Sequence, residues 1–340
     1  MSDDAAVKLT TYFGERARAD GGFLADALVG IYARHRLQTS VVMRGLAGFG
    51  AKHQLRTDRL LSLSEDLPMV AVAVDARAQI DAALADVRAL GRCAGLLTLE
   101  RARMLLVQDF VRPADIDGLA KLTVYVGRHE RTGGRPAHVA VVDLLHSRGV
   151  AGATVLLGLD GTRRGERRRA RLVGRNAEVP LMVVAVGDGD RITRTLRDLG
   201  ALLPQPLATL ERVQICKRDG VLLERPRALA GRDPSGLPLW QKLMVYTSER
   251  SRHGDAPLHR ALIGALRGAG APGATTVRGI WGYHGDHAPH GDRLWQLRRH
   301  VPVVTTVIDR PDAVQRWFDV IDTVTAATGL VTSEMVPVLV

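Results

Sequence analysis

A glycine-rich segment near residue 45 is the first part of the chain whose residue types could bind a ligand. It reads Arg44-Gly45-Leu46-Ala47-Gly48-Phe49-Gly50. Glycine lets backbone N–H groups approach an anion closely and allows positive φ angles. Arg44 and the nearby Lys52 would neutralise the charge of a phosphate or a similar group. The alternative is a glycine-rich loop that serves only to reverse the chain.

The same arrangement returns twice further along the chain. The third copy keeps the arginine and both glycines but has His284 where the first copy has Gly50, and the middle copy has Leu157 in place of the arginine. If Arg44 contributes to binding, we expect the middle copy to bind more weakly. The predicted ligand-binding residues are Arg44, Gly45, Gly48, Gly50, Lys52, His53, Arg278, Gly279, Gly282 and His284.

A run of arginines follows the middle glycine pair. It contains Arg163, Arg164, Arg167, Arg168, Arg169, Arg171 and Arg175. Such a run attracts polyanions because binding releases their counterions, but it lacks the interleaved aromatic residues that stack on bases. We therefore favour a solvated loop. Contact of Arg163, Arg164, Arg167, Arg168 and Arg169 with an acidic protein surface or nucleic acid is the alternative.

The third copy contains a cluster of histidines and aspartates: His284, Asp286, His287, His290 and Asp292. Imidazoles beside carboxylates can bind zinc, but only if the segment folds around the ion, and proline and glycine disfavour a regular helix here. His287 also aligns with His53, so it is a position of the repeat. We predict no metal site and keep pH-dependent ordering of the segment as an alternative.

Catalytic groups are not arranged as in a known enzyme motif. His53, Ser62, Ser64 and Asp66 could form a triad on paper, but no Gly-x-Ser-x-Gly or Walker sequence accompanies them. The serine stretch is also lost in the other two copies. Glu100, Glu211 and Glu334 recur beside threonine, and we predict a structural salt bridge or hydrogen bond for them. The chain is therefore expected not to be an enzyme.

The amino-acid composition limits which cellular locations and which binding partners are expected for the protein. The 340 residues are 46% hydrophobic but only 4% aromatic, which predicts aliphatic cores, and no stretch approaches the roughly 20 apolar residues of a membrane span. The polar N-terminus resembles no signal peptide, and Cys93 and Cys216 suggest no disulfide framework. A cytoplasmic location is expected. The net charge of +11 favours anionic partners, or else only keeps the protein dissolved.

Internal repeats organise these features. Lys8-Leu9-Thr10 returns as Lys121-Leu122-Thr123 and Lys242-Leu243-Met244, and Thr98-Leu99-Glu100 returns as Thr209-Leu210-Glu211 and Thr332-Ser333-Glu334. We predict repeats at residues 7–107, 121–216 and 241–340, of which the second is degenerate. Linkers would occupy residues 108–120 and 217–240, the second as a loosely structured strap.

Each repeat reads as strand, helix, strand, strand, helix, strand. In the first repeat we predict strands at 7–13, 40–43, 69–74 and 96–107, the second ending at the glycine-rich loop. Helix spacing places Phe23, Leu24, Ala27, Leu28 and Ile31 on one face, and a second helix spans 78–90. This order is that of the ferredoxin-like unit. Two helices cover one sheet face, and the open face must pack against the sister repeats.

Three motifs of the first repeat resemble a PII-like family that is catalogued as domain of unknown function 190. They are Tyr12-x-Gly14-Glu15, the segment from Arg44 to Gly50, and Leu61-Ser62-Leu63-Ser64-Glu65-Asp66-Leu67-Pro68. The resemblance implies trimers whose open sheets meet at a central axis, with nucleotides bound between subunits and a long signalling loop. We therefore expect an α+β chain of three ferredoxin-like units that forms a monomeric, intramolecular pseudo-trimer, since tethering makes assembly intramolecular.

The resemblance also implies a function. We expect a non-enzymatic regulator that binds an adenine nucleotide or another small anion between repeats and signals to a protein partner, which could be a membrane transporter or channel. A ligand-free scaffold that docks through its basic loop is one alternative. Weak nucleic-acid binding is the other, and it rests on charge alone.

Overall fold

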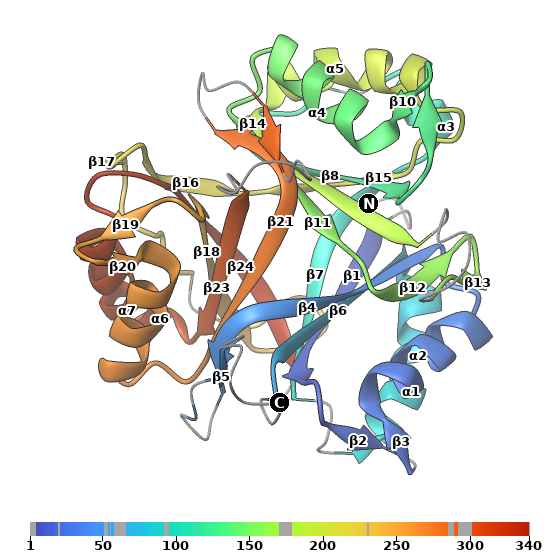
Figure 1. The fold of residues 1–340 in the computed structure, drawn as a ribbon. Helices are drawn as coiled ribbons and strands as arrows, with labels where there is room; N and C mark the ends of the chain where they lie inside the picture. The colour runs from blue at the N-terminus through green and yellow to red at the C-terminus, as the bar shows by residue number, and fades with distance from the viewer. Residues whose placement is uncertain are drawn as a thin grey trace.

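The computed structural model shows three similar lobes, each with two helices on the outside and strands toward the middle (Figure 1). The structure describes residues 5–19, 21–50, 54, 56–57, 66–91, 95–113, 115–169, 179–229, 231–284, 289–291 and 301–339. In this part of the chain, no helix has both the length and the apolar character needed to cross a membrane.

The first repeat has the predicted order of elements. Its main elements are β1 (Ala5–Gly14), α1 (Leu24–Arg34), β4 (Thr39–Phe49), β6 (Pro68–Ala76), α2 (Arg77–Ala89) and β7 (Leu96–Leu105). Short strands β2 (Arg18–Ala19), β3 (Gly22–Phe23) and β5 (Arg56–Thr57) flank them. The sheet is antiparallel and its strand order is β4-β6-β1-β7.

The second repeat follows the same plan with one interruption. Its main elements are β8 (Leu119–Gly127), α4 (Ala137–Ser147), β11 (Gly152–Leu157), β12 (Asp160–Arg163), β14 (Pro180–Asp188), α5 (Gly189–Leu202) and β15 (Ala208–Arg212). The short strands are β9 (Arg131–Thr132), β10 (Arg135–Pro136) and β13 (Glu166–Arg167). The strand order β11-β14-β8-β15 matches that of the first repeat.

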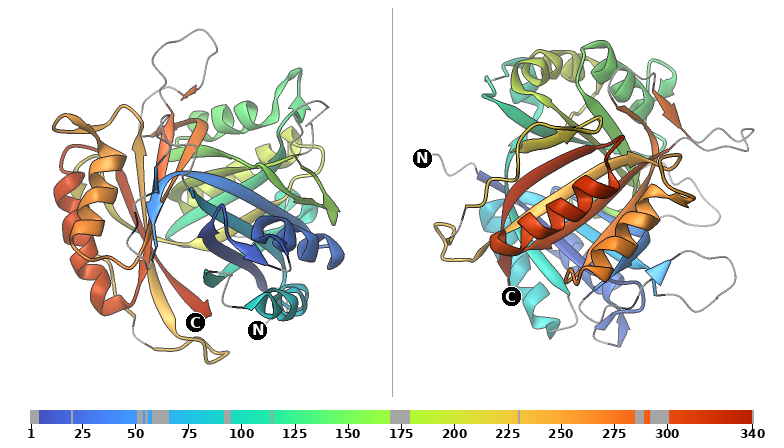
Figure 2. Two further views of the ribbon diagram at one scale, coloured as in Figure 1. Left: turned by 60° about the horizontal axis from the view of Figure 1, so that its bottom comes forward. Right: turned by 90° about the vertical axis from the view of Figure 1, so that its left-hand side faces the viewer.

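The third repeat has the elements β18 (Leu239–Ser248), α6 (Leu258–Gly268), β21 (Ala274–His284), β23 (Pro302–Asp309), α7 (Pro311–Val324) and β24 (Leu330–Leu339). Its short strands are β19 (Arg252–His253), β20 (Ala256–Pro257) and β22 (His290–Gly291). Its strand order is β21-β23-β18-β24. Figure 2 shows α6 and α7 lying against one face of this sheet.

Each helix pair buries its apolar stripe on its own sheet. In the first repeat, Leu28 of α1 and Ile80, Leu84 and Val87 of α2 join one buried cluster, as the helix spacing predicts. The prediction that Phe23 lies on this buried face is wrong, because 45% of the residue is exposed. It precedes the helix, and its ring lies beneath the guanidinium of Arg18, 4.8 Å from the ring centroid.

The opposite sheet faces of the three repeats share another apolar cluster. It includes Val41 and Val72 from the first repeat, Val184 from the second, and Val277 and Val304 from the third. Aliphatic side chains supply most of the cluster, as the low aromatic content predicts. Burying these faces against one another removes apolar surface from water that an isolated four-stranded sheet would expose.

Main-chain pairing also joins the repeats in a closed cycle. The second half of β4 pairs with β21, the second half of β21 pairs with β11, and β12 pairs with the first half of β4. The prediction that the second strand ends at the glycine-rich loop is therefore wrong. Strand β4 continues through both glycines to Phe49, because the sister repeat supplies the hydrogen-bond partners.

The linkers pack onto the repeats. The first contains α3 (Val107–Val111), whose Phe110 is buried in the core of the second repeat. The second begins with β16 (Gln214–Arg218) and β17 (Val221–Leu222). The sequence predicts a loosely structured strap there, but Arg225 forms an ion pair with Asp319 of α7, at 2.5 Å. This part of the linker is fixed to the third repeat.

Candidate functional site

Six charged residues meet at the centre of the molecule, where the shared sheet faces come together. Each repeat supplies one lysine from its first strand and one glutamate from its last strand. The two lie directly opposite one another in the antiparallel ladder: Lys8 with Glu100, Lys121 with Glu211, and Lys242 with Glu334. Because opposite residues of a strand pair point to the same face, all six side chains extend toward the sister repeats.

These residues form a closed ring of alternating charge, which we call the Lys–Glu ring. Every lysine Nζ contacts carboxylate oxygens of two glutamates. The six distances are Lys8–Glu100 2.6 Å, Lys8–Glu211 2.5 Å, Lys121–Glu211 3.3 Å, Lys121–Glu334 2.6 Å, Lys242–Glu334 3.0 Å and Lys242–Glu100 2.9 Å. Each repeat is thus bonded to both others, and the ring as a whole is electrically neutral.

Burial makes these contacts strong and mutually dependent. All six side chains are at most 6% exposed. Although burial acts to raise it, the attraction of Lys242 and Lys8 holds the pKa of Glu100 well below its ordinary value. Burial acts to lower the pKa of Lys8, but the attraction of Glu100 and Glu211 is stronger and raises this pKa well above its usual range. Both residues therefore remain charged inside the protein.

The ring is not perfectly symmetric. At Lys121, burial outweighs the attraction of Glu211 and Glu334 and lowers the pKa of the ammonium group. Its contact with Glu211, at 3.3 Å, is also the longest of the six. The second repeat therefore contributes the weakest segment of the ring.

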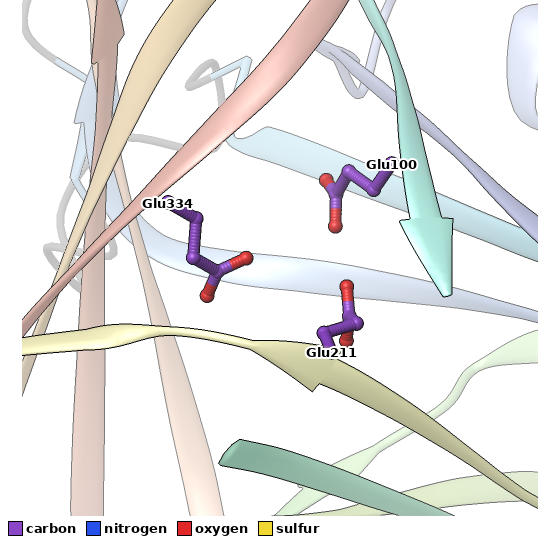
Figure 3. Close-up of side chains that lie close together, drawn as sticks. All are labelled: Glu100, Glu211 and Glu334. Carbon is purple, nitrogen blue, oxygen red and sulfur yellow. The ribbon is translucent and has the colours of Figure 1, made fainter. Parts of the chain in front are cut away.

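The three glutamates also have the composition of a metal site. One oxygen from each lies within 4.8 Å of the others, and Figure 3 shows the carboxylates pointing toward one another. Three ammonium groups already balance their charge, however, and a divalent cation would add buried charge without a counterion. The arrangement is better explained as a structural salt bridge, and this confirms the prediction for Glu100, Glu211 and Glu334.

The lysines of the ring are functional residues that the sequence reasoning missed. Lys8, Lys121 and Lys242 were visible only as the first letter of a repeated motif. A charged residue that opens a strand of largely apolar residues in every repeat, together with a glutamate that recurs in every closing strand, is the signal that could have identified the ring.

A cavity of about 500 Å³ lies between repeats 1 and 3. Four aromatic residues line it: Tyr12, Phe13, Phe49 and Trp240. Several glycines, which have no side chain to fill the space, also line it, including Gly50 just after β4 and Gly273 just before β21. No charged side chain of the described residues lines this cavity. Its chemistry suits a flat, largely apolar group.

The corresponding cavity between repeats 2 and 1 has a volume of about 340 Å³, and polar and charged side chains line it alongside apolar ones. Arg163 occupies the position equivalent to Gly50, and Arg164 lies beside it. Gln38 of the first repeat and Gln108 of the first linker also line this cavity. The two clefts therefore present different chemistry to a ligand.

Both predicted ligand-binding arginines form ion pairs within their own repeat. Arg44 contacts Glu15, and Arg278 contacts Glu249, in each case at 2.8 Å. Arg44 does not line the cavity between repeats 1 and 3. These arginines hold the turn after the first strand against the second strand, so their positive charge is already balanced.

The paired glycines allow the strands of neighbouring repeats to meet. A Cβ added at Gly48 would lie 2.6 Å from the carbonyl oxygen of Ala274, and one at Gly161 would lie 2.0 Å from that of Ser40. At Gly282 the corresponding distance, to the Ala153 oxygen, is 2.2 Å. Gly45 and Gly279 are similarly confined by a neighbouring carbonyl and a proline ring. Only glycine fits, because the carbonyl belongs to the adjacent β-ladder.

The remaining predicted residues divide into described and undescribed ones. Gly50 faces open space and lines the cavity between repeats 1 and 3. His290 lies on β22, paired with Gly282. Lys52, His53, Ser62, Ser64, His287, Arg171, Arg175 and the side chain of His284 lie outside the described residues.

The arginine run contacts acidic residues of this chain. Arg167 bridges Asp160, at 2.5 Å, and Asp26 of α1, at 2.6 Å. Arg169 reaches Asp26 at 3.0 Å, and Arg163 contacts Glu130 at 2.6 Å. Arg168 pairs with Glu166. For residues 163–169, the prediction of a solvated loop is wrong, because the pairs of Arg167 and Arg169 with Asp26 and the backbone hydrogen bonds from Arg164 and Gly165 to Gln38 and Leu37 attach the hairpin to the first repeat.

Comparison with known proteins adds the family context. The model of the family DUF190, described as "Uncharacterized ACR", matches residues 6–104, 119–215 and 240–338. A "UPF0166 protein" of Aquifex aeolicus is 32% identical over 97 residues, which are 28% of this chain and 90% of that protein. A crystal structure of aspartate kinase from Synechocystis matches with a TM-score of 0.29 and 14% identity. That match covers 97% of this chain and 44% of the kinase, and a similarity this low carries no argument.

Proposed function

Because the chain belongs to the DUF190 family, we propose that it is a PII-like regulatory protein that binds a small ligand between its repeats. In this proposal it is not an enzyme. It is a monomer in which three ferredoxin-like units form a pseudo-trimer. Ligand binding at the cleft between repeats 1 and 3 would change the segment after β4 and so alter contact with a protein partner, such as a membrane transporter or channel.

The closed arrangement supports the pseudo-trimer. Cyclic strand pairing links all three repeats, and a second cycle joins the closing strands: Leu105 with Ala208, Thr332 with Ile215, and Thr98 with Val338. Without its neighbours, each repeat would leave these backbone groups unpaired. A ligand between two repeats therefore acts on the interface that holds the molecule together.

The observation that carries the ligand proposal is the aromatic cavity between repeats 1 and 3. Phe49 ends β4, Gly50 follows it, and Pro68 begins β6, so the cavity lies where the long segment between these strands leaves and re-enters the sheet. Aromatic walls favour a planar group such as a purine base. Lys52 and His53 remain the candidates for its phosphates.

Thermal unfolding with nucleotides tests this proposal. A ligand that binds only the folded state must stabilise it. We expect ATP, ADP or AMP at about 1 mM to raise the Tm by about 2 °C or more. Gly50→Leu should abolish the shift, since the new side chain would fill the cavity. Gly264→Leu is the matched control, because Gly264 lies on the exposed side of α6 and also faces open space.

Three outcomes would overturn the ligand proposal. One is the absence of a shift with every nucleotide, and another is an equal shift in the Gly50→Leu protein. A shift that inorganic phosphate reproduces would also contradict it, because the cavity lacks charged lining residues in the described part of the chain. Adenosine should retain part of the shift, since the aromatic wall recognises the base.

A further inference from the structure

A further cavity, formed by described residues, lies over the Lys–Glu ring. Its volume is about 620 Å³, which is within the range of small-molecule sites. All three repeats and both linkers line it. It is separate from the inter-repeat clefts, because on β7 it begins at Glu100, whereas the cleft between repeats 1 and 3 is lined at Gly95 and Leu96.

The floor of this central cavity consists of the three ring glutamates, while none of the ring lysines lines it. Glu211 is the least satisfied of the three. Its Oε1 atom accepts from Lys8 at 2.5 Å, but its Oε2 atom is buried without a hydrogen-bond partner and lies 3.3 Å from the ammonium of Lys121. The Oε2 atom of Glu100 also lacks a hydrogen-bond partner, but it lies 2.6 Å from the ammonium of Lys8 and 2.9 Å from that of Lys242, and Thr10 and Thr98 both donate to its Oε1 atom. A donor group of a ligand would be best received at Glu211.

The rim carries charges of both signs, because Asp115, Asp117 and Asp233 line the cavity together with four arginines. Arg212 follows Glu211 on β15, is exposed, and has no acidic partner among the described residues. Arg232 of the second linker also lines the cavity, and its guanidinium donates to the carbonyl oxygen of Gly236. The remaining rim arginines are paired, Arg101 with Asp233 at 3.7 Å and Arg103 with Asp109 at 3.5 Å.

We propose that the central cavity is a second ligand site, which binds a small zwitterion of the amino-acid type. The ammonium group would donate to Glu211, and the carboxylate would accept from Arg212 and Arg232. A simple anion meets the carboxylate floor, and a simple cation leaves Arg212 and Arg232 without an anionic partner, so a molecule with both charges fits best. Arginine is suited to bind a carboxylate in two-pronged geometry.

A ligand in the central cavity would contact all three repeats and both linkers. Equivalent positions one residue after the ring glutamates hold Arg101, Arg212 and Met335. The rim is therefore asymmetric and directs the anionic end of a ligand toward the second repeat. Since the linkers Asp115–Asp117 and Arg232–Pro234 form part of the wall, fusion of the repeats supplies contacts that separate subunits would not have.

A screen of the twenty standard amino acids, each at about 10 mM, tests the proposal through the Tm of the intact protein. At least one amino acid should raise the Tm, and isothermal titration with it should give a measurable Kd. Arg212→Ala should weaken binding about tenfold or more. Arg194→Ala is the matched control, because Arg194 is an exposed arginine on α5 that does not line the cavity, and it should bind as the parent does.

Several results would overturn it. These are no stabilisation by any amino acid, equal affinity of the Arg212→Ala and Arg194→Ala proteins, or equal stabilisation by inorganic phosphate. Arg212 is exposed, so its loss should leave the fold intact. The nucleotide response of the Arg212→Ala protein should also be unchanged, which separates failure of this site from failure of the nucleotide cleft.

Discussion

The Lys–Glu ring and the ends of the second strands occupy equivalent places in the three repeats, but they have diverged very differently. Every repeat supplies the same lysine and the same glutamate to the ring. At the mouth of the clefts, by contrast, equivalent positions hold Gly50, Arg163 and His284. A buried charge cannot change unless its two neighbours change with it, whereas a residue at a cleft mouth can vary singly. The comparison separates the part of the molecule that holds the repeats together from the part in which each repeat can become specialised.

The largest expected effect is acid unfolding through the ring. The folded-state pKa values of Glu100 and Glu334 are lowered, because the attraction of the lysines exceeds the effect of burial. Their stabilisation is therefore fully present above about pH 4.5 and is lost as the pH falls through the folded-state values. We expect the free energy of unfolding to fall steeply below about pH 4.5, as measured by urea denaturation.

An all-apolar ring provides the control for that experiment. Replacing all six ring residues with methionine removes the titrating groups and leaves no buried charge unpaired, a change that is often neutral or stabilising. The acid dependence should then become shallower. If the parent and the methionine protein lose stability in parallel below pH 4.5, the ring is not the group responsible.

Breaking the ring at one position should be the next largest effect. Lys121→Met leaves Glu211 and Glu334 each with one remaining lysine contact, and such an uncompensated buried charge costs about 3–5 kcal/mol. Arg77→Ala removes an exposed ion pair with Asp81 and should cost only about 0.3–0.5 kcal/mol. Chemical denaturation measures both. A cost below about 1 kcal/mol for Lys121→Met would show that the ring is not structurally important.

Substitution of a glycine in the ladder between repeats tests whether that glycine is required by close strand contact or only by a flexible loop. Gly161→Ala places a methyl group against the carbonyl of Ser40, and overpacking of this kind costs about 1–3 kcal/mol. Gly264→Ala, in open space on α6, should instead stabilise by about 0.5–1 kcal/mol. Thermal unfolding of the two proteins should shift in opposite directions. Equal Tm values would indicate that Gly161 is not confined by the neighbouring strand.

The smallest expected effect concerns the arginine hairpin. Arg167→Ala removes the bridge to Asp26 and Asp160, but the guanidinium is 31% exposed, so the loss should be about 1 kcal/mol or less. The difference from the parent should shrink as salt is added, because salt screens partly exposed charges. Arg194→Ala should show no such salt dependence. A salt-independent loss in Arg167→Ala would assign the effect to packing.

Much of the fold could be predicted from the sequence, because it is encoded locally. The recurrence of Lys-Leu-Thr and Thr-Leu-Glu identifies the repeats, and helix spacing identifies the buried stripe of Ile80, Leu84 and Val87. The course of β4 could not be predicted in this way. Its glycines are typical of a loop when read alone, and only the strand of a sister repeat about 230 residues away makes them part of a ladder.

The candidate sites were less predictable for the same reason. A run of seven arginines indicates a solvated segment, but Asp26, which neutralises two of them, lies far earlier in the chain. A lysine at the start of a strand is normally expected to be exposed. The three ring lysines can be predicted to be buried only if the glutamates that face them are recognised. Contacts between repeats determine the surroundings of both the arginine hairpin and the ring lysines, and these contacts cannot be read from the local sequence.

Small-angle X-ray scattering with in-line mass determination tests most directly whether the three repeats close on one another within one chain. A closed monomer should have a mass of 36.8 kDa and a radius of gyration of about 20 Å, as expected for a compact chain of this length. A particle of about three times that mass, or a monomer whose radius of gyration is clearly larger than this because its repeats are strung apart, would contradict the closed arrangement.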